Sequence, residues 1–226
     1  MRYRLAVFDF DGTLADSYPW FVGAMNHVAD RYRFRRVEAH ELDVLRGLDA
    51  RGVIEHLGVP MWKMPFIVRH MRRRIAADAG RIALFPGAGD LLRRLAESGV
   101  AIALVTTNTE ANVRRILGPE NARLVRHWGC GASMFGKRPR IRKVLRDSRV
   151  PPAEAVCVGD ELRDLHAARA EGVAFAAVTW GFTAPAALRA HAPEAVFDTM
   201  AELADALAPA VPASTDPAST GHAPGG

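Results

Sequence analysis

The chain has 226 residues, of which 49% are hydrophobic and 24% are charged, and its formal net charge is +5. This balance is typical of a folded globular protein and excludes a disordered or fibrous chain. The length allows one large domain or a core with a small insertion, but it excludes several unrelated domains. The positive excess lies in residues 30–81, which hold eleven Arg and one Lys against seven acidic residues. Such an excess favours an anionic partner: nucleic acid, acidic lipid or a phosphorylated metabolite.

Cysteine usage and the apolar stretches indicate a cytoplasmic protein. Cys130 and Cys157 are the two cysteines of the chain, too few for a disulfide scaffold. Four apolar residues precede Asp9, which is well short of a signal-peptide core. The longest uncharged stretch, residues 172–188, is short for a membrane-spanning helix and contains Gly and Pro. We therefore expect no membrane segment.

Short apolar runs alternate with helical patterns along the chain. The run Leu5–Phe8 is apolar throughout and ends at Asp9, as expected for a strand buried on both faces of a parallel sheet. Similar runs occur at 101–105, 155–158 and 173–178, and helical patterns at 87–98, 141–146 and 162–171. This alternation predicts an α/β fold with a Rossmann-like, doubly wound parallel sheet. Ligands of such sheets bind at the carboxyl ends of the strands.

Residues 17–80 interrupt this alternation. Apolar residues recur there at helical spacing in two series, Phe21, Met25, Val28, Ala29 and Tyr32, then Met64, Ile67, Val68, Met71 and Ile75. We expect an all-helical domain inserted after the first strand, with residues 1–16 and 81–207 forming the α/β core. Residues 208–226 are mostly Ala, Pro, Ser, Thr and Gly, so we expect a disordered tail that cannot offset its ordering entropy.

Two pairs of acidic residues follow predicted strands. Asp9 and Asp11 share one loop with Gly12, where their charges repel unless a cation that takes oxygen ligands binds between them. Asp160 and Asp164 follow a later strand and are one helical turn apart, so both can face the same cation. The alternative for each pair is capping of the helix that follows.

Further polar residues follow another strand and begin a later helix. Thr106, Thr107 and Asn108 come after the run 101–105, and their hydroxyl and amide groups can donate to phosphate oxygens, although helix capping is the commoner use. Lys137 is one of three lysines against 27 arginines, which indicates that a compact point charge is needed there. The alternative is a lysine that faces solvent.

The order and spacing of these motifs resemble the haloacid dehalogenase-like hydrolase superfamily. The four matching motifs are Asp9-Phe10-Asp11-Gly12-Thr13, Thr106, Lys137 and Gly159-Asp160 with Asp164. The resemblance extends from residue 5 to about 205. The helical insertion is similar to the first cap type of that superfamily, found in members that resemble phosphoglycolate phosphatase. Phe85-Pro86-Gly87 and the stretch 179–182 are similar to the same subgroup.

This resemblance implies a Mg²⁺-dependent phosphatase that acts on a small phosphorylated metabolite, a phosphoglycolate-like monoester. It implies that Asp9 is the nucleophile and forms an aspartyl-phosphate, and that Asp11 is first the acid and then the base. Thr106 and Lys137 would contact the phosphoryl group. The implied metal ligands are Asp9, Asp11 through its backbone carbonyl, Asp160 and Asp164.

Three further residues are expected to contact the substrate. Thr107 and Asn108 lie beside Thr106, and Arg46 is next to Gly47 in a loop of the insertion, where it can contact an anionic group. A surface arginine is the alternative for Arg46. Arg69, Arg72 and Arg73 lie off the apolar series, which predicts that most of this cluster faces solvent.

Other functions remain open at this point. A sugar-phosphate mutase uses the same core residues and differs in shielding the phosphorylated enzyme from water. A phosphonatase needs a lysine in the cap, for which Lys63 is the candidate, at a poorly matching distance. The basic insertion also suits an anion-binding or nucleic-acid-binding protein, although no nucleic-acid-binding motif is visible. We expect a small phosphorylated metabolite as partner, no nucleic acid or membrane, and a monomer or homodimer.

Overall fold

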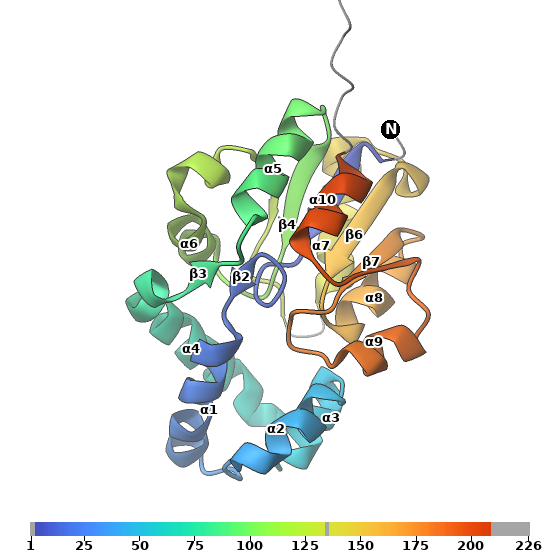
Figure 1. Cartoon of the computed structure of the whole chain (residues 1–226). Coiled ribbons are helices and arrows are strands. Elements are labelled where there is room, and N and C mark those ends of the chain that lie inside the picture. The colour runs from blue at the N-terminus through green and yellow to red at the C-terminus, as the bar shows by residue number, and fades with distance from the viewer. Residues whose placement is uncertain (1–2, 134–135, 209–226) are drawn as a thin grey trace, which may run out of the picture.

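The computed structural model describes residues 3–133 and 136–208 of the chain (Figure 1). The predicted tail, apart from its first residue, lies outside the described residues. No helix in the described part of the chain is both long and apolar enough to cross a membrane.

A six-stranded sheet forms the centre of the fold, and all of its neighbouring strands are parallel. Its spatial order is β5 (Val125–Gly129), β4 (Ala101–Val105), β1 (Leu5–Phe8), β6 (Ala155–Gly159), β7 (Ala174–Val178) and β8 (Ala195–Phe197). The chain starts at β1, winds outward through β4 and β5, then returns to β6 on the other side of β1. This is the doubly wound order, so the predicted fold class is confirmed, and the crevice of such a sheet lies where the winding reverses, beside β1.

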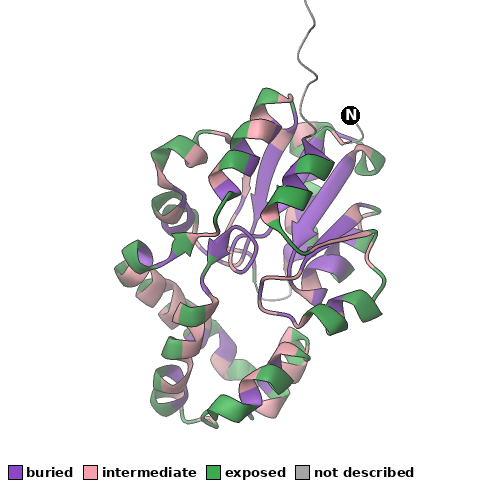
Figure 2. Cartoon of the chain, in the orientation of Figure 1, coloured by how far each residue is buried: buried purple, intermediate pink, exposed green. Residues whose placement is uncertain are grey.

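Helices cover both faces of the sheet because successive strand residues point to opposite sides. Ala6 and Phe8 of β1 belong to a hydrophobic cluster with α5 (Ala88–Glu97), α6 (Glu110–Ala122) and α10 (Met200–Leu207). Leu5 and Val7 belong to a second cluster with α7 (Lys137–Ser148), α8 (Leu162–Arg169) and α9 (Pro185–Ala190). Figure 2 shows the resulting buried strands between more exposed helices.

Residues 17–80 form helices and no strand. The helices are α1 (Tyr18–Tyr32), α2 (Leu42–Arg46), α3 (Ala50–His56) and α4 (Met64–Asp78), with 3₁₀ helices at Ala39–Glu41, Met61–Lys63 and Ala79–Arg81. They share a hydrophobic cluster of their own, which includes Val28, Leu45, Ile54 and Ile67. A two-stranded antiparallel ribbon, β2 (Ala15–Asp16) with β3 (Ala83–Leu84), joins this helical layer to the sheet (Figure 1).

The edges of the sheet differ from what the apolar runs indicate. Residues 123–130 are not a clean strand in the sequence, yet β5 lies there and pairs with β4 through a register shift at Ile102 and Ala103. Arg126 is exposed and His127 half-buried, which is compatible with an edge strand that has one neighbour. The helix expected at 141–146 begins earlier, at Lys137, and α6 contains a non-helical residue at Gly118.

Candidate active site

Three buried aspartates meet at the carboxyl edge of the sheet. Asp9 follows β1, Asp160 follows β6, and Asp164 lies in the first turn of α8. Strands β1 and β6 are neighbours, with Phe8 opposite Val158, so their carboxyl ends deliver Asp9 and Asp160 to the same place. One carboxylate oxygen from each of the three aspartates lies within 4.8 Å of the others. The structure thus brings Asp9 of the first acidic pair together with both members of the second pair.

Lys137 lies among these carboxylates at the start of α7. Its Nζ is 2.7 Å from Asp9 Oδ2 and also pairs with Asp164 Oδ1. Burial alone would lower the pKa of Lys137, but the charges of Asp164 and Asp9 outweigh it and raise the pKa to about 12. The side chain is 4% exposed. The ammonium therefore stays charged and holds Asp9 in place, whereas the alternative of a solvent-facing lysine is excluded.

Asp160 is fixed by neighbours on both of its carboxylate oxygens. The hydroxyl of Thr13 donates to Oδ1 at 2.6 Å, and the backbone N–H of Phe182 donates to Oδ2 at 2.7 Å. Two glycines make room for this carboxylate. A Cβ atom at Gly12 would come within 2.4 Å of Asp160 Oδ2, and one at Gly181 within 2.3 Å of the same side chain. The position of Asp160 therefore depends on residues from two other loops, which follow β1 and β7.

The electrostatics of the aspartate cluster favour a bound cation. Burial, together with the charges of Glu161, Asp9 and Asp164, raises the pKa of Asp160 well above its usual value. Burial also raises the pKa of Asp164 to about 7, although the charge of Lys137 acts in the opposite direction. One ammonium cannot neutralise three carboxylates. Oxygen ligands this close together fit a hard divalent cation such as Mg²⁺, which would relieve their repulsion.

Asp11 lies beside this cluster and faces a cavity. Its Oδ2 accepts a hydrogen bond from Asn108 Nδ2 at 3.3 Å. Burial and the charge of Asp9 raise the pKa of Asp11 to about 6. Asp11 lines a cavity of about 280 Å³ between the sheet edge and the helical layer, as do Thr107 and Asn108. A carboxyl group in this position can exchange a proton with a molecule that enters the cavity.

The residues after β4 lie at the same edge because β4 is the other neighbour of β1. Thr106 is buried, and its hydroxyl accepts a hydrogen bond from the backbone N–H of Asn108 at 3.0 Å. Asn108 Oδ1 accepts from the backbone N–H of Thr109 and from the Asn112 side chain. The structure therefore brings Thr106, Thr107 and Asn108 to the site, whereas their contacts to a substrate stay predictions.

Two arginines of the helical layer reach across to the sheet. Arg46 donates from Nε to the carbonyl of Phe182 at 3.2 Å and from Nη2 to that of Gly181 at 3.0 Å. Arg72 donates from Nε and Nη2 to the carbonyl of Thr107, and from Nη2 to that of Ala132 at 3.0 Å. Arg46 and Arg72 both line the cavity. The expected contact between Arg46 and the substrate stays a prediction.

The expectation that most of the cluster Arg69, Arg72 and Arg73 faces solvent agrees with the exposure of Arg69 and Arg73, whereas Arg72 is half-buried and donates to the sheet side. Helical spacing identifies the face that points away from the insertion's own hydrophobic cluster, but not the second surface that packs against that face.

Arg163, which pairs with Glu161 and also lines the cavity, was missed as well. Its position in the first turn of α8, next to Asp164, could have identified it in the sequence as a residue of the site. Lys63 donates to the carbonyl of Tyr32 at 2.7 Å and is not among the described residues that line the cavity.

Comparisons with known proteins agree with this fold. The family model of haloacid dehalogenase-like hydrolases matches residues 6–178. The chain is 29% identical over 202 residues to a phosphoglycolate phosphatase of Synechococcus elongatus, covering 89% of this chain and 95% of that protein. It is also 29% identical over 191 residues to the tyrosine-protein kinase PtkA of Mycobacterium tuberculosis, covering 79% of this chain and 63% of that protein.

A solved structure shares the fold along nearly its whole length. The haloacid dehalogenase-like hydrolase from Streptococcus pneumoniae superposes with a TM-score of 0.74 at 22% identity, covering 89% of this chain and 97% of that one. The family model spans β1 to β7 and includes each aspartate of the cluster, together with Lys137. The chain therefore belongs to the haloacid dehalogenase-like hydrolases.

Proposed function

We propose that this enzyme is a Mg²⁺-dependent phosphatase that hydrolyses a small phosphate monoester through an aspartyl-phosphate formed on Asp9. The observation that carries the proposal is the buried group of Asp9, Asp160 and Asp164 around Lys137, beside a cavity that Asp11 lines. The name of the Synechococcus elongatus relative makes phosphoglycolate the first substrate to test.

The chemistry assigned to these residues has two steps. In the first, the Asp9 carboxylate attacks the phosphorus atom while Asp11 donates a proton to the departing oxygen. In the second, Asp11 takes a proton from a water molecule, whose oxygen attacks the phosphorus atom and releases Asp9. Asp9, Asp160, Asp164 and the backbone carbonyl of Asp11 would hold Mg²⁺, which supplies positive charge against the phosphoryl oxygens when bound. Lys137 orients Asp9, and Thr106 would bind the phosphoryl group.

The same residues can serve a mutase, which passes the phosphoryl group to a second substrate instead of water. The two activities differ in their product, because only hydrolysis releases inorganic phosphate.

The phosphonatase alternative loses support because Lys63 donates to the Tyr32 carbonyl and does not line the cavity. We also propose a cytoplasmic location and a small phosphorylated metabolite, not nucleic acid, as partner. A mobility shift of DNA or RNA at physiological salt would contradict that part.

The proposal is tested by hydrolysis of p-nitrophenyl phosphate. We expect activity with Mg²⁺, its loss in EDTA, and its return when Mg²⁺ is added in excess. The Asp9→Asn variant should release no nitrophenol above background, because an amide is a far weaker nucleophile. Asp90→Asn, a change of an exposed aspartate on α5, is the matched control and should behave as the wild type. Activity retained by a folded Asp9→Asn variant would contradict the assigned nucleophile.

A further inference from the structure

The cavity beside Asp11 has two chemically different ends. Its volume is about 280 Å³, which is many times the ~10–15 Å³ that one water molecule needs. The end at the sheet is polar and includes Asp11, Thr107 and Asn108. The remainder extends into the helical layer, where apolar side chains form most of the wall; they include Phe21, Met25, Leu45, Leu48, Val53 and Ile67. A molecule whose phosphate lies near Asp9 would place its other end among these side chains.

The arginines that line the cavity are held at its sheet end by protein partners. Three arginines line it: Arg46, Arg72 and Arg163. Arg46 donates to the carbonyls of Gly181 and Phe182, and Arg72 donates to those of Thr107 and Ala132. Arg163 pairs with the carboxylate of Glu161. These contacts hold the arginines at the sheet end of the cavity, so a negative group placed among the apolar side chains of the helical layer would be buried without a charged partner, which is costly.

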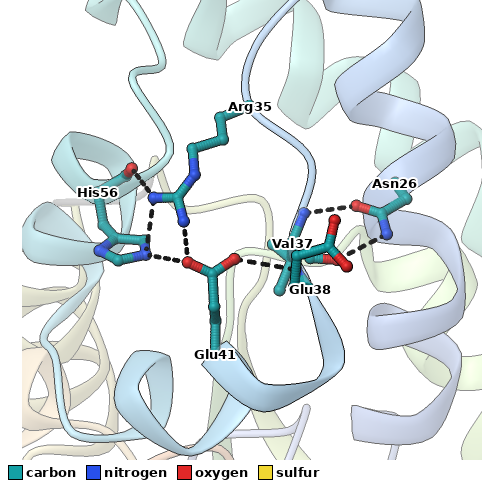
Figure 3. A network of polar contacts seen from close by, with 6 residues as sticks. All are labelled: Asn26, Arg35, Val37, Glu38, Glu41 and His56. Carbon is teal, nitrogen blue, oxygen red and sulfur yellow. Dashed lines mark hydrogen bonds and ion pairs between the residues drawn. The ribbon is translucent and has the colours of Figure 1, made fainter.

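Polar contacts outside the cavity hold its wall in place. The Asn26 side chain accepts from the backbone N–H of Val37 at 2.7 Å and donates to the Val37 carbonyl at 2.9 Å (Figure 3). Glu41 pairs with Arg35 and contacts His56 Nε2 at 3.2 Å (Figure 3). These contacts tie the segment between α1 and α2 to α1 and to the end of α3.

This bracing bears directly on the cavity. Phe34, Leu42 and Leu57 line it, and each is next in sequence to a residue of the polar network. Collapse of the helical layer onto the empty space would move these side chains inward and break hydrogen bonds that are partly buried. The wall is therefore shaped by contacts that remain whether or not the cavity is filled.

From this arrangement we propose that the cavity takes up the organic part of the substrate and that this part is apolar, of the size of a medium alkyl chain or one aromatic ring. The inference rests on the proposed phosphatase function. Apolar cavities on the order of 150 Å³ already bind benzene, so this cavity is large enough for such a group. Burial of each methylene from water also strengthens binding. By the same argument phosphoglycolate, whose single carboxylate is a second negative group beside the phosphate, is a poor substrate.

A series of n-alkyl phosphates tests the inference, because ethyl, butyl and hexyl phosphate have leaving groups of nearly equal acidity. We expect kcat/KM to rise roughly three- to fourfold with each added methylene, and hexyl phosphate to exceed phosphoglycolate. A kcat/KM that is flat or falls with chain length, or that is highest for phosphoglycolate, overturns the inference and leaves the phosphatase function standing. Failure to hydrolyse any ester, p-nitrophenyl phosphate included, overturns both.

A variant that fills the cavity tests whether the dependence of kcat/KM on chain length arises there. Ala50 of α3 lines the cavity, and Ala50→Phe should bring the ratio of kcat/KM between hexyl and ethyl phosphate close to one. The control is Ala77→Phe, at an exposed position of α4, which should keep the wild-type ratio. An unchanged ratio in a folded Ala50→Phe variant contradicts the inference. If that variant does not fold, inhibition of the wild-type enzyme tests the same inference. We expect hexylphosphonate to inhibit more strongly than ethylphosphonate, and equal inhibition overturns the inference.

Discussion

Gly181 shows how strictly single residues control the metal-binding carboxylates of the proposed site. A Cβ atom at this position would come within 2.3 Å of Asp160, which both Thr13 and Phe182 hold in place. We therefore predict that Gly181→Ala displaces Asp160 and lowers kcat/KM for p-nitrophenyl phosphate about a hundredfold, the usual cost of a misplacement of about 1 Å.

The control for this prediction is Gly80→Ala, since a Cβ atom at Gly80 would meet no atom within 4 Å. Its kcat/KM should equal that of the wild type. The Mg²⁺ concentration for half-maximal activity is the second measurement, because a displaced ligand weakens metal binding. Equal activity and equal Mg²⁺ dependence in both variants would show that Asp160 is not held as described.

Lys137 has a structural role that can be measured apart from catalysis. Lys137→Met would leave the buried carboxylates of Asp9 and Asp164 without their counter-charge. Removal of one partner of a buried ion pair costs about 3–5 kcal/mol. We predict a loss of that size in the free energy of unfolding, measured by urea denaturation in EDTA, and partial recovery when Mg²⁺ is added. Lys143→Met, in the same helix but at the surface, should change the stability little.

At the level of single residues, the sequence predicted the side chains that follow strands directly. Asp9, Asp160 and Thr106 each come after an apolar run, and neighbouring strands of a parallel sheet end at one edge, so their meeting point follows from topology alone. The partners of Arg72 could not be predicted in this way. They are backbone carbonyls of residues 35 and 60 positions away, which become neighbours only when the helical layer packs against the sheet.

Two helices allow the same substitution to be compared in opposite backbone conformations. Gly23 lies exposed in α1, whereas Gly118 interrupts α6 with a φ of 74° before Pro119. A Cβ atom at either position would meet no atom within 4 Å, so packing does not distinguish them. We predict that Gly23→Ala stabilises the fold by about 0.5–1 kcal/mol, and that Gly118→Ala destabilises it by about 1–3 kcal/mol.

Urea denaturation of the two variants measures this pair directly. A shift of both midpoints in the same direction would mean that the conformational difference between Gly23 and Gly118 does not govern their stability. Because the chemical change is identical, the wild type and the two variants serve as mutual controls.

Among the secondary-structure elements, central strands were predicted better than edge strands. The strands β1, β4, β6 and β7 are buried on both faces and are therefore nearly continuous apolar runs. In contrast, β5 has an exposed Arg126 and a half-buried His127, and β8 is three residues long and only partly buried. A strand with one neighbour and one solvated face leaves a weaker signal in the sequence.

The contact between the helical layer and the sheet gives a prediction for the molecule as a whole. Arg72 donates to two carbonyls of the sheet domain, and its own carbonyl accepts from Asn112 of α6 at 3.0 Å. A hydrogen bond from a charged group contributes about 1.5–3 kcal/mol. We predict that Arg72→Met accelerates amide hydrogen exchange in α4 and lowers kcat/KM, because the helical layer opens more often.

Arg73→Met is the matched control, since Arg73 is the exposed neighbour in the same helix. It should leave both the exchange rates of α4 and kcat/KM near the wild-type values. If Arg72→Met leaves amide exchange in α4 as slow as in the wild type, the hydrogen bonds of the Arg72 side chain do not hold the helical layer against the sheet.

At the scale of the whole molecule, the helical insertion could be read from the sequence, but the cavity could not. Apolar residues at helical spacing predict that Val28 and Ile67 pack inward. They do not reveal that the packing leaves room, because a residue such as Met25 or Val53 lines a cavity or fills a core with the same hydrophobic pattern. The difference depends on how α1, α3 and α4 are spaced, which contacts distant in sequence determine.

The ribbon of β2 and β3 bears on how enzymes of this kind diversify. Asp16 and Ala83 are paired across it, so the chain leaves the sheet domain and re-enters it at adjacent points. Whatever is inserted there has ends that already meet, and its length is not constrained by the spacing of the six strands. The insertion can then be exchanged in one recombination event for one with a differently shaped interior, while the aspartates and Lys137 keep their positions. A new substrate range would need no new catalytic residue.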